Sequence, residues 1–173
     1  MDIQTDQTPY TLRRATEADL DAVTALEAAC FPPAEAADRS AFDWRLRCYA
    51  HHFWVLEREG QLISFVNGPV TKERDLVDEM FASPTFCDDS GDWQMIFGVA
   101  THPDYQHQGL ASLVMRRFIA DAQANGCKGV VLTCKEPKIP FYARFGYLDE
   151  GLSSSTHGGA PWHQMRLTFS KHC

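Results

Sequence analysis

Residues 93–134 contain the pattern that most restricts how this chain can fold. An apolar run, WQMIFGVAT at 93–101, precedes a long amphipathic segment at 109–125, and the short β-branched run GVVLTC follows at 129–134. Two strands joined by a helix lie parallel in one sheet with a right-handed crossover. The helix is predicted by apolar side chains that recur every three or four positions, namely Leu110, Leu113, Val114, Phe118, Ile119 and Ala122.

The rest of the chain adds strands and helices around this unit. Strands are predicted from Tyr10, in the hairpin FWVLERE and LISFVNG around Gly60, from Tyr147 and in WHQMRLTF. Helices are predicted after the capping-box-like TEAD, over 39–50, over 72–81 and over 139–145. The order β-α-α-β-β then β-α-β-α-β-β predicts an α/β (α+β) fold, in which a central twisted mixed sheet is flanked by helices.

Composition narrows the classes of partner. The 173 residues fit a single domain spanning 1–173. The formal charge of -7 disfavours nucleic acid as a partner, because phosphate backbones select basic surfaces. No apolar run approaches the ~20 residues needed to cross a bilayer, so no membrane partner is expected. The start MDIQTDQTPY lacks the features of a secretory signal, which favours a cytoplasmic location.

The cysteines predict neither a metal site nor a nucleophile. They show no C-x-x-C pair and no spacing typical of zinc sites, and no local signature of a catalytic cysteine surrounds any of them. We therefore expect small buried residues or surface thiols, and no metal. The six are Cys30, Cys48, Cys87, Cys127, Cys134 and Cys173.

The segment QHQGLA at 106–111 stands where a polar loop turns into the long helix. Backbone N–H groups at a helix start are unpaired and carry the positive end of the helix dipole, so they form an anion site. Small residues at Gly109 and Ala111 let an anion such as a pyrophosphate reach those groups. The loop has neither the Gly-Lys-Ser/Thr of a Walker A loop nor a G-x-G-x-x-G dinucleotide motif. The alternative is a tight turn in which glycine serves packing alone.

This loop after VATHPDY, together with PFYARFGY at 140–147, resembles the acyl-CoA signature of the GNAT N-acetyltransferase superfamily. Within the superfamily the sequence is most similar to the serotonin, or arylalkylamine, N-acetyltransferase group. LISFVNGPVTKERD, VATHPDYQHQG and LTCKEPKIPFYARFGY carry that likeness in order. The resemblance covers nearly the whole chain, and it implies a GNAT-like acyl-CoA N-acyltransferase fold with acetyl-CoA as cosubstrate.

The resemblance also implies which residues bind acetyl-CoA. The backbone of Val99 and Thr101 would pair with the pantetheine arm. The side chains of His107 and Gln108 either add hydrogen bonds to the cosubstrate or stay solvated. The pyrophosphate would be held by the amides of His107, Gln108, Gly109, Leu110, Ala111 and Ser112.

Tyr142, in Pro140-Phe141-Tyr142, corresponds to the family tyrosine that protonates the departing thiolate. A phenol with a pKa of about 10 stays protonated at neutral pH and can donate to a thiolate whose thiol has a pKa of about 8.5. The alternative is a core tyrosine whose ring anchors its helix.

The base that deprotonates the amine is not carried over from the family. Vertebrate members of the group have two histidines on the strand that enters the motif, where this chain has Met95 and Phe97. Three substitutes are open: a water chain held by Gln94, a loop histidine, or an acidic side chain in 73–79. The histidines are His157 and His163, whereas His102 is expected to shape its loop. The acidic residues, which can equally form a solvated face, are Glu73, Asp75, Asp78 and Glu79.

Aromatic residues and one amide offer a pocket for the acceptor. Asn67 stands in a strand interior beside Gly68, where it either bonds within a bulge or faces the acceptor. The aromatic residues either line a pocket for an arylalkyl group or belong to the core; they are Phe31, Trp93, Phe97 and Trp162.

Together these observations predict an N-acetyltransferase, a monomer or homodimer, that moves acetyl from acetyl-CoA to a small primary amine. The amine would attack directly in a ternary complex. One alternative is acetylation of a protein, peptide or polyamine, which needs an open groove or an acidic channel. Another is a CoA-binding sensor without turnover, suggested by the missing histidine pair and opposed by Tyr142. Likeness of fold constrains the reaction and leaves the acceptor open.

Overall fold

The structure, a computed structural model, describes residues 9–170, so Cys173 lies outside the described residues. Its strands form two sheets. The first is antiparallel, in the order β1 (Tyr10–Arg14), β2 (Phe53–Arg58), β3 (Gln61–Asn67) and β6 (Gly98–Thr101). The second is mixed, in the order β4 (Val70–Thr71), β5 (Trp93–Met95), β7 (Gly129–Cys134), β9 (His163–Thr168) and β8 (Leu148–Leu152).

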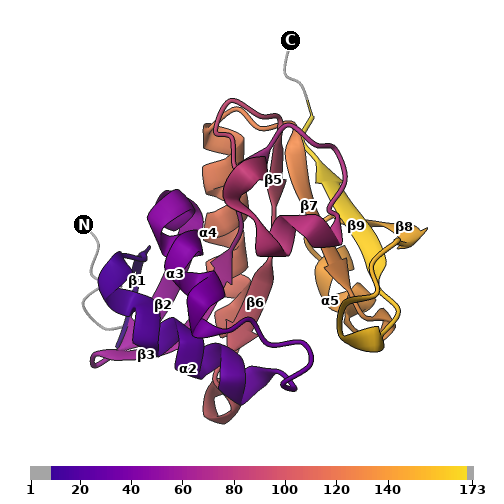
Figure 1. The fold of residues 1–173 in the computed structure, drawn as a ribbon. Coiled ribbons are helices and arrows are strands. Elements are labelled where there is room, and N and C mark those ends of the chain that lie inside the picture. The colour runs from indigo at the N-terminus through magenta and orange to yellow at the C-terminus, as the bar shows by residue number, and fades with distance from the viewer. Residues whose placement is uncertain (1–8, 171–173) are drawn as a thin grey trace.

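Helices cover both faces of the first sheet (Figure 1). Along β2, Val55 packs into the cluster of α2 (Leu20–Cys30) and α3 (Arg39–Tyr49), while Leu56 packs into the cluster of α4 (Leu110–Ala124). Successive side chains of a strand point to opposite faces, so this alternation places helices on each. The short α5 (Ile139–Ala143) precedes β8.

Short 3₁₀ helices occupy connecting segments. They are η1 (Glu17–Asp19), η2 (Ala50–His52), η3 (Asp78–Ala82), η4 (Pro84–Phe86), η5 (Pro103–Tyr105), η6 (Glu136–Lys138) and η7 (His157–Gly159). Within the described residues, no helix is both long enough and apolar enough to span a membrane.

Several predictions from the sequence are confirmed. β5 and β7 are parallel neighbours joined through α4, and β2 with β3 forms the predicted hairpin. The chain after β1 turns as TEAD predicts, because Thr16 N donates to the Asp19 carboxylate at 2.8 Å. Gly126 ends α4 with a φ of 83°, a left-handed conformation that glycine adopts without steric cost.

The run 93–101 was predicted as one strand, and this is wrong. The backbone changes sheets at two successive residues: Ile96 N donates to Val131 O at 2.9 Å, and Phe97 N donates to Asn67 O at 2.7 Å. β5 therefore belongs to one sheet and β6 to the other, and the two sheets diverge beyond this point (Figure 1).

The helix predicted over 72–81 is also wrong, since only η3 forms there. The preceding residues are held extended by side chains from the second sheet: Arg166 Nη1 donates to Arg74 O at 2.8 Å, and Leu76 N donates to Gln164 Oε1 at 3.1 Å. These bonds use backbone groups that a helix would need for itself, so tertiary contacts override the local periodicity.

One residue of the predicted α4 stripe is misplaced. Leu113 is 41% exposed, whereas Met115 is fully buried. Leu110, Val114 and Phe118 point at the sheet as expected. The buried arc is centred on these three, and Leu113 lies on the far side of it.

Candidate active site

The divergence of β6 from β7 opens a cleft of about 1460 Å³. One wall is β6 and the opposite wall is the end of β7 with the following loop and α5. β6 pairs with β3 alone among the described strands, so its other edge is free to pair with an extended ligand.

The free edge carries the backbone groups of Val99 and Thr101. His102 N donates to Ile63 O at 2.7 Å, so the backbone N–H and C=O groups of His102 point towards β3. Those of Ala100, two residues earlier, point the same way. In an antiparallel pair the intervening residues point the other way. Val99 and Thr101 therefore direct their N–H and C=O groups towards the cleft, where the Thr101 carbonyl accepts hydrogen bonds from Cys30 Sγ and Gln106 Nε2, both at 3.2 Å.

The loop before α4 has the backbone shape of an anion site. His107 and Gly109 both have positive φ, 64° and 79°, and Gly109 is the N-cap of α4. Left-handed residues of this kind turn consecutive N–H groups inward, beside the positive end of the helix dipole. Gly109, Leu110, Ala111 and Ser112 line the cleft with His107, while Gln108 is exposed and does not line it.

The backbone conformation gives a second physical reason for glycine at this position. A Cβ on Gly109 would meet no atom within 4 Å, so the space around it is open. The left-handed φ is what selects glycine here. The open space is the volume into which an anion would approach the helix start.

Tyr142 lies on α5 and lines the cleft, although only 9% of it is exposed. Its ring packs edge-on against Phe141 and Tyr147, with centroids 5.0 and 5.9 Å away. Burial raises the pKa of Tyr142 well above that of a free phenol. The hydroxyl is therefore protonated at neutral pH and can act as a proton donor.

The cysteines of the cleft are not nucleophiles. Cys30 Sγ donates to Thr101 O at 3.2 Å, and burial raises its pKa. Burial also raises the pKa of Cys134 to about 11. Both are thiols at neutral pH, and the thiolate is the nucleophilic form.

Glu27 of α2 is the residue that sequence reasoning missed. It lines the cleft and is 6% exposed, with Ala37 N donating to its Oε2 at 2.9 Å and no partner for Oε1 within residues 9–170. Oε1 lies 3.8 Å from the position of a Cβ on Gly98, so the carboxylate faces the point where β6 begins. Burial raises the pKa of Glu27 despite the hydrogen bond from Ala37. The available signal was a glutamate on the apolar stripe of Val23 and Leu26.

Arg45 of α3 is a second buried charged residue in the lining of the cleft. It is 4% exposed and lines the cleft; its Nη2 donates to Phe81 O at 3.3 Å, and its Nε has no partner in the described part of the chain. Its guanidinium carbon lies 5.0 Å from the ring centroid of Phe97 and 5.7 Å from that of Trp44. A buried cation whose donors are unfilled has affinity for an anionic group.

A loop from the second sheet closes the same end. His157 Nε2 lies 2.9 Å from Glu35 O, and because a carbonyl only accepts, Nε2 carries the hydrogen and Nδ1 keeps a lone pair. The His157 ring stacks 5.6 Å from Phe81, and Trp162 Nε1 donates to His157 O at 2.7 Å. Phe31, Phe97, His157 and Trp162 all line the cleft.

Glu35, in the connection between α2 and α3, also bonds to the wall that contains β7. Lys135, beyond β7, forms a salt bridge of 2.6 Å with its carboxylate, which is mostly buried. The loop of His157 and the wall of β7 are thus tied to the connection between α2 and α3.

Two predicted substrate residues lie elsewhere. Asn67 is fully buried; its Oδ1 accepts a hydrogen bond from Tyr49 at 2.6 Å, and its Nδ2 has no partner within residues 9–170. Gln94 is 1% exposed, and its Nε2 donates to Gly68 O at 2.7 Å and to Met95 O at 2.9 Å. Neither lines the cleft. The Asn67 amide bonds to a residue of α3, and the Gln94 amide satisfies backbone carbonyls where β3, β4 and β5 meet.

The other candidates for the base either lie outside the cleft or already accept hydrogen bonds from the protein. His163 contacts Asp149 at 3.2 Å, away from the cleft. Asp78 lines the cleft but accepts bonds from Ser155 Oγ at 2.6 Å and Thr156 N at 3.1 Å, which anchor the loop of His157. The cleft is not lined by Glu73, Asp75, Glu79 or Trp93.

His102 acts as predicted for a residue that shapes its loop. Its Nδ1 accepts a hydrogen bond from Asp104 N at 3.1 Å and so caps η5.

Comparisons with known proteins agree with this architecture. The model of the acetyltransferase (GNAT) family matches residues 20–147. Serotonin N-acetyltransferase of Mesocricetus auratus is 24% identical over 115 residues, which are 66% of this chain and 54% of that protein. The match thus spans about half the length of this relative.

Two solved structures share the fold. The loading GNATL domain of CurA from Lyngbya majuscula superposes with a TM-score of 0.81 at 17% identity, over 93% of this chain and 98% of that one. The protein yncA from Salmonella typhimurium, solved with acetyl-CoA, has a TM-score of 0.68 at 16% identity, over 95% and 96%. Likeness at these identities establishes the fold alone. Because the family match extends over most of its length, this chain belongs to the acetyltransferase (GNAT) family.

Proposed function

We propose that this protein transfers acetyl from acetyl-CoA to a small primary amine. One observation carries the proposal: a single cleft combines the free edge of β6, the left-handed N-cap of α4, a buried tyrosine and a buried carboxylate. The first two fit the pantetheine arm and pyrophosphate of acetyl-CoA, as hydrogen-bonding edge and anion site. The last two are a proton donor and a proton acceptor.

Glu27 is the base in this proposal. An alkylammonium must lose a proton before its nitrogen can attack the thioester carbonyl. A carboxylate with a raised pKa accepts a proton more readily than an exposed one, and Oε1 of Glu27 is unpartnered at the start of β6. His157 is the alternative base, through Nδ1, although its Nε2 is held by Glu35.

The reaction then closes without a metal ion. The amine nitrogen forms a bond to the acetyl carbon, and the bond from that carbon to the CoA sulfur breaks. The alkylammonium gives one proton to Glu27 before the attack, and the nitrogen releases a second proton to solvent as the amide forms. Tyr142 gives its hydroxyl proton to the leaving thiolate. Exchange of protons with solvent restores both side chains.

The aromatic wall favours an arylalkyl group on the acceptor. Phe31, Phe97 and Trp162 line the acceptor end with Phe81, and an aryl ring buried there gains a hydrophobic contribution of about 1.5–3 kcal/mol. This agrees with an acceptor of the phenethylamine or tryptamine type. A peptide acceptor would need an open groove, whereas the salt bridge between Lys135 and Glu35 spans this end of the cleft.

Arg45 favours a second candidate, an aromatic amino acid. Its Nε is buried without a partner, and within the described residues no salt bridge joins it to Glu27. A carboxylate on the acceptor would fill the unpaired donor, with its amine nearer Glu27. An acceptor without a carboxylate leaves Nε of Arg45 without a hydrogen-bond partner.

The test is release of CoA by the purified protein with acetyl-CoA and matched acceptors: tryptamine against tryptophan, phenethylamine against phenylalanine, with spermidine and a short peptide as rivals. Turnover of the aryl amines supports the first candidate, and a preference for the amino acids that Arg45→Met abolishes supports the second. Turnover of the peptide or spermidine alone would refute both. If acetyl-CoA raises the Tm but no acceptor reacts, the protein binds acetyl-CoA and either uses an acceptor outside this panel or is a CoA-binding sensor.

Two variants separate the candidate bases. Glu27→Gln should lower kcat by about 10²-fold or more if Glu27 takes the proton. His157→Gln should then change kcat much less, because the glutamine can still donate to Glu35 O. The opposite result would assign the proton to His157.

A further inference from the structure

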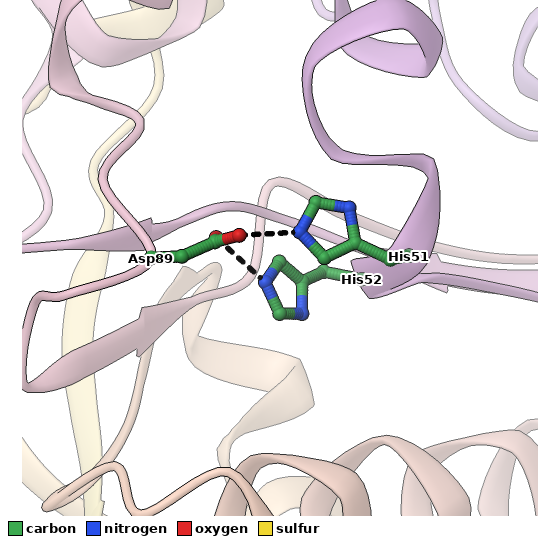
Figure 2. A group of neighbouring side chains, drawn as sticks. All are labelled: His51, His52 and Asp89. Atoms are coloured by element: carbon green, nitrogen blue, oxygen red, sulfur yellow. Dashed lines mark hydrogen bonds and ion pairs between the residues drawn. The ribbon is translucent and has the colours of Figure 1, made fainter.

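Three side chains that could ligate a metal meet outside the active-site cleft (Figure 2). His51 and His52 lie in η2, between α3 and β2, and Asp89 lies in the segment 83–92 that leads to β5. Figure 2 shows both imidazole rings directed at the Asp89 carboxylate. None of the three lines the cleft of the candidate active site.

The distances suit one small cation. Asp89 Oδ2 lies 2.7 Å from His51 Nε2, and Oδ1 lies 3.0 Å from His52 Nε2. One ligand atom from each of the three residues lies within 4.8 Å of the other two. Ligands bound tetrahedrally at about 2.0–2.1 Å stand roughly 3.3 Å apart. The two histidine–aspartate contacts are therefore within about 0.3–0.6 Å of the separation between two such ligands.

We propose that His51, His52 and Asp89 form a binding site for a divalent transition metal, best suited to Zn²⁺. Two imidazole nitrogens and one carboxylate oxygen are ligands that zinc accepts and that Mg²⁺ and Ca²⁺, which prefer oxygen, do not favour. Three protein ligands leave a fourth position for water. A hollow of about 250 Å³ beside the cluster, lined also by Val70 and Asn125, provides room for it.

The scaffold holds the ligands in place. His52 is 5% exposed, and Asp89 is fixed through its neighbour, because Asp88 N donates to Val70 O at 2.8 Å. Gly91 further restricts the segment, since a Cβ there would lie 2.1 Å from Thr71 O. The ligands thus approach the ion from two separate parts of the chain that are each anchored.

The local charge also fits. The nearby cation Arg14 is neutralised by a 3.0 Å salt bridge with Asp121.

One feature limits the affinity. His52 Nδ1 is buried and has no hydrogen-bond partner within residues 9–170. Ligating histidines usually donate their second N–H to a carboxylate or carbonyl, and loss of that partner weakens binding about 10–100-fold. The site should therefore bind zinc less tightly than structural zinc sites do. Its role would be a cross-link between η2 and the segment 83–92.

The experiment uses the whole chain, stripped with a chelator and titrated with ZnCl₂ or MgCl₂. Zinc at a hundred times its Kd should raise the Tm by about 5–10 °C with a stoichiometry of one, and magnesium should not. Asp89→Asn should lower zinc affinity at least about tenfold. Asp89 is 65% exposed in its side chain, so this variant is expected to fold.

Asp149→Asn is the matched control, because Asp149 contacts a single histidine, His163, at 3.2 Å on the other sheet. It should bind zinc like the original chain. Co²⁺ gives a second readout: visible bands of a tetrahedral site without a thiolate charge-transfer band support the three ligands. Equal zinc binding by Asp89→Asn and Asp149→Asn, a thiolate band, or no shift in Tm with zinc would overturn the proposal.

Discussion

Replacing Gly109 by alanine should weaken CoA binding by more than its effect on stability explains. Gly109 has a φ of 79°, and a Cβ there meets no atom within 4 Å, so the change introduces backbone strain and no clash. Holding a non-glycine residue in this conformation costs about 1–2 kcal/mol. For a chain of this size that lowers the Tm by about 2–8 °C.

Gly126 at the other end of α4 provides the control. It has a φ of 83° and is equally free of neighbours within 4 Å. Gly126→Ala should therefore lose a similar stability, while its position is remote from the N–H groups at the helix start. Any difference between the two variants in CoA affinity then reports the anion site and not strain.

The expected difference follows from the amides at the start of α4. A hydrogen bond to a charged group contributes about 1.5–3 kcal/mol. If the new methyl group or a shifted loop removes one such bond, CoA affinity falls about 10–150-fold in Gly109→Ala and stays within about twofold in Gly126→Ala. Calorimetric titration with CoA measures both. Equal affinities for the two variants would refute the placement of the pyrophosphate at this loop.

Three further predictions concern single side chains. Tyr142→Phe should lower kcat by about 10²-fold or more with the Kd for acetyl-CoA unchanged, and an unchanged kcat would exclude Tyr142 as the proton donor. Burial raises the pKa of Glu27, so between the usual carboxyl pKa and the raised one the folded protein holds a proton that the unfolded chain has released. The stability of the original chain should therefore fall as pH rises through that interval. A series of Tm measurements should show that Glu27→Gln removes this fall. Hydrogen bonds from Arg13 hold the pKa of Asp19 below its usual value, so stability should be lost as pH falls through the folded pKa. Asp19→Asn should cost about 1–2 kcal/mol in urea unfolding at pH 7 and flatten the acid limb, whereas an acid limb that is unchanged would contradict this assignment.

The parts of the candidate site that could be predicted are those carried by local backbone. The loop before α4 and the strand β6 present main-chain groups, and their shape follows from a few adjacent residues such as His107 and Gly109. Tyr142 was predicted from the family resemblance that Pro140-Phe141-Tyr142 carries. In each case the information lies within one short segment.

The parts that failed depend on partners distant in sequence. Asn67 and Gln94 are polar residues in strands, which is compatible with a pocket, but their partners come from α3 and from the junction of β3, β4 and β5. Glu27 was not singled out from the sequence, although α2 presents it to the start of β6. His51 and His52 are 37 or more residues from Asp89 and show no recognisable spacing.

The sequence by itself determined the crossover of β5, α4 and β7, the hairpin of β2 and β3 and the position of the helix start at Gly109, because periodicity, turn residues and helix starts are local properties. Only the tertiary structure decided that the run 93–101 divides between two sheets at Ile96 and Phe97, since that depends on which amide finds which carbonyl. The division opens the cleft, and the packing of α2 and α3 then places two buried charged residues, Glu27 and Arg45, in its lining.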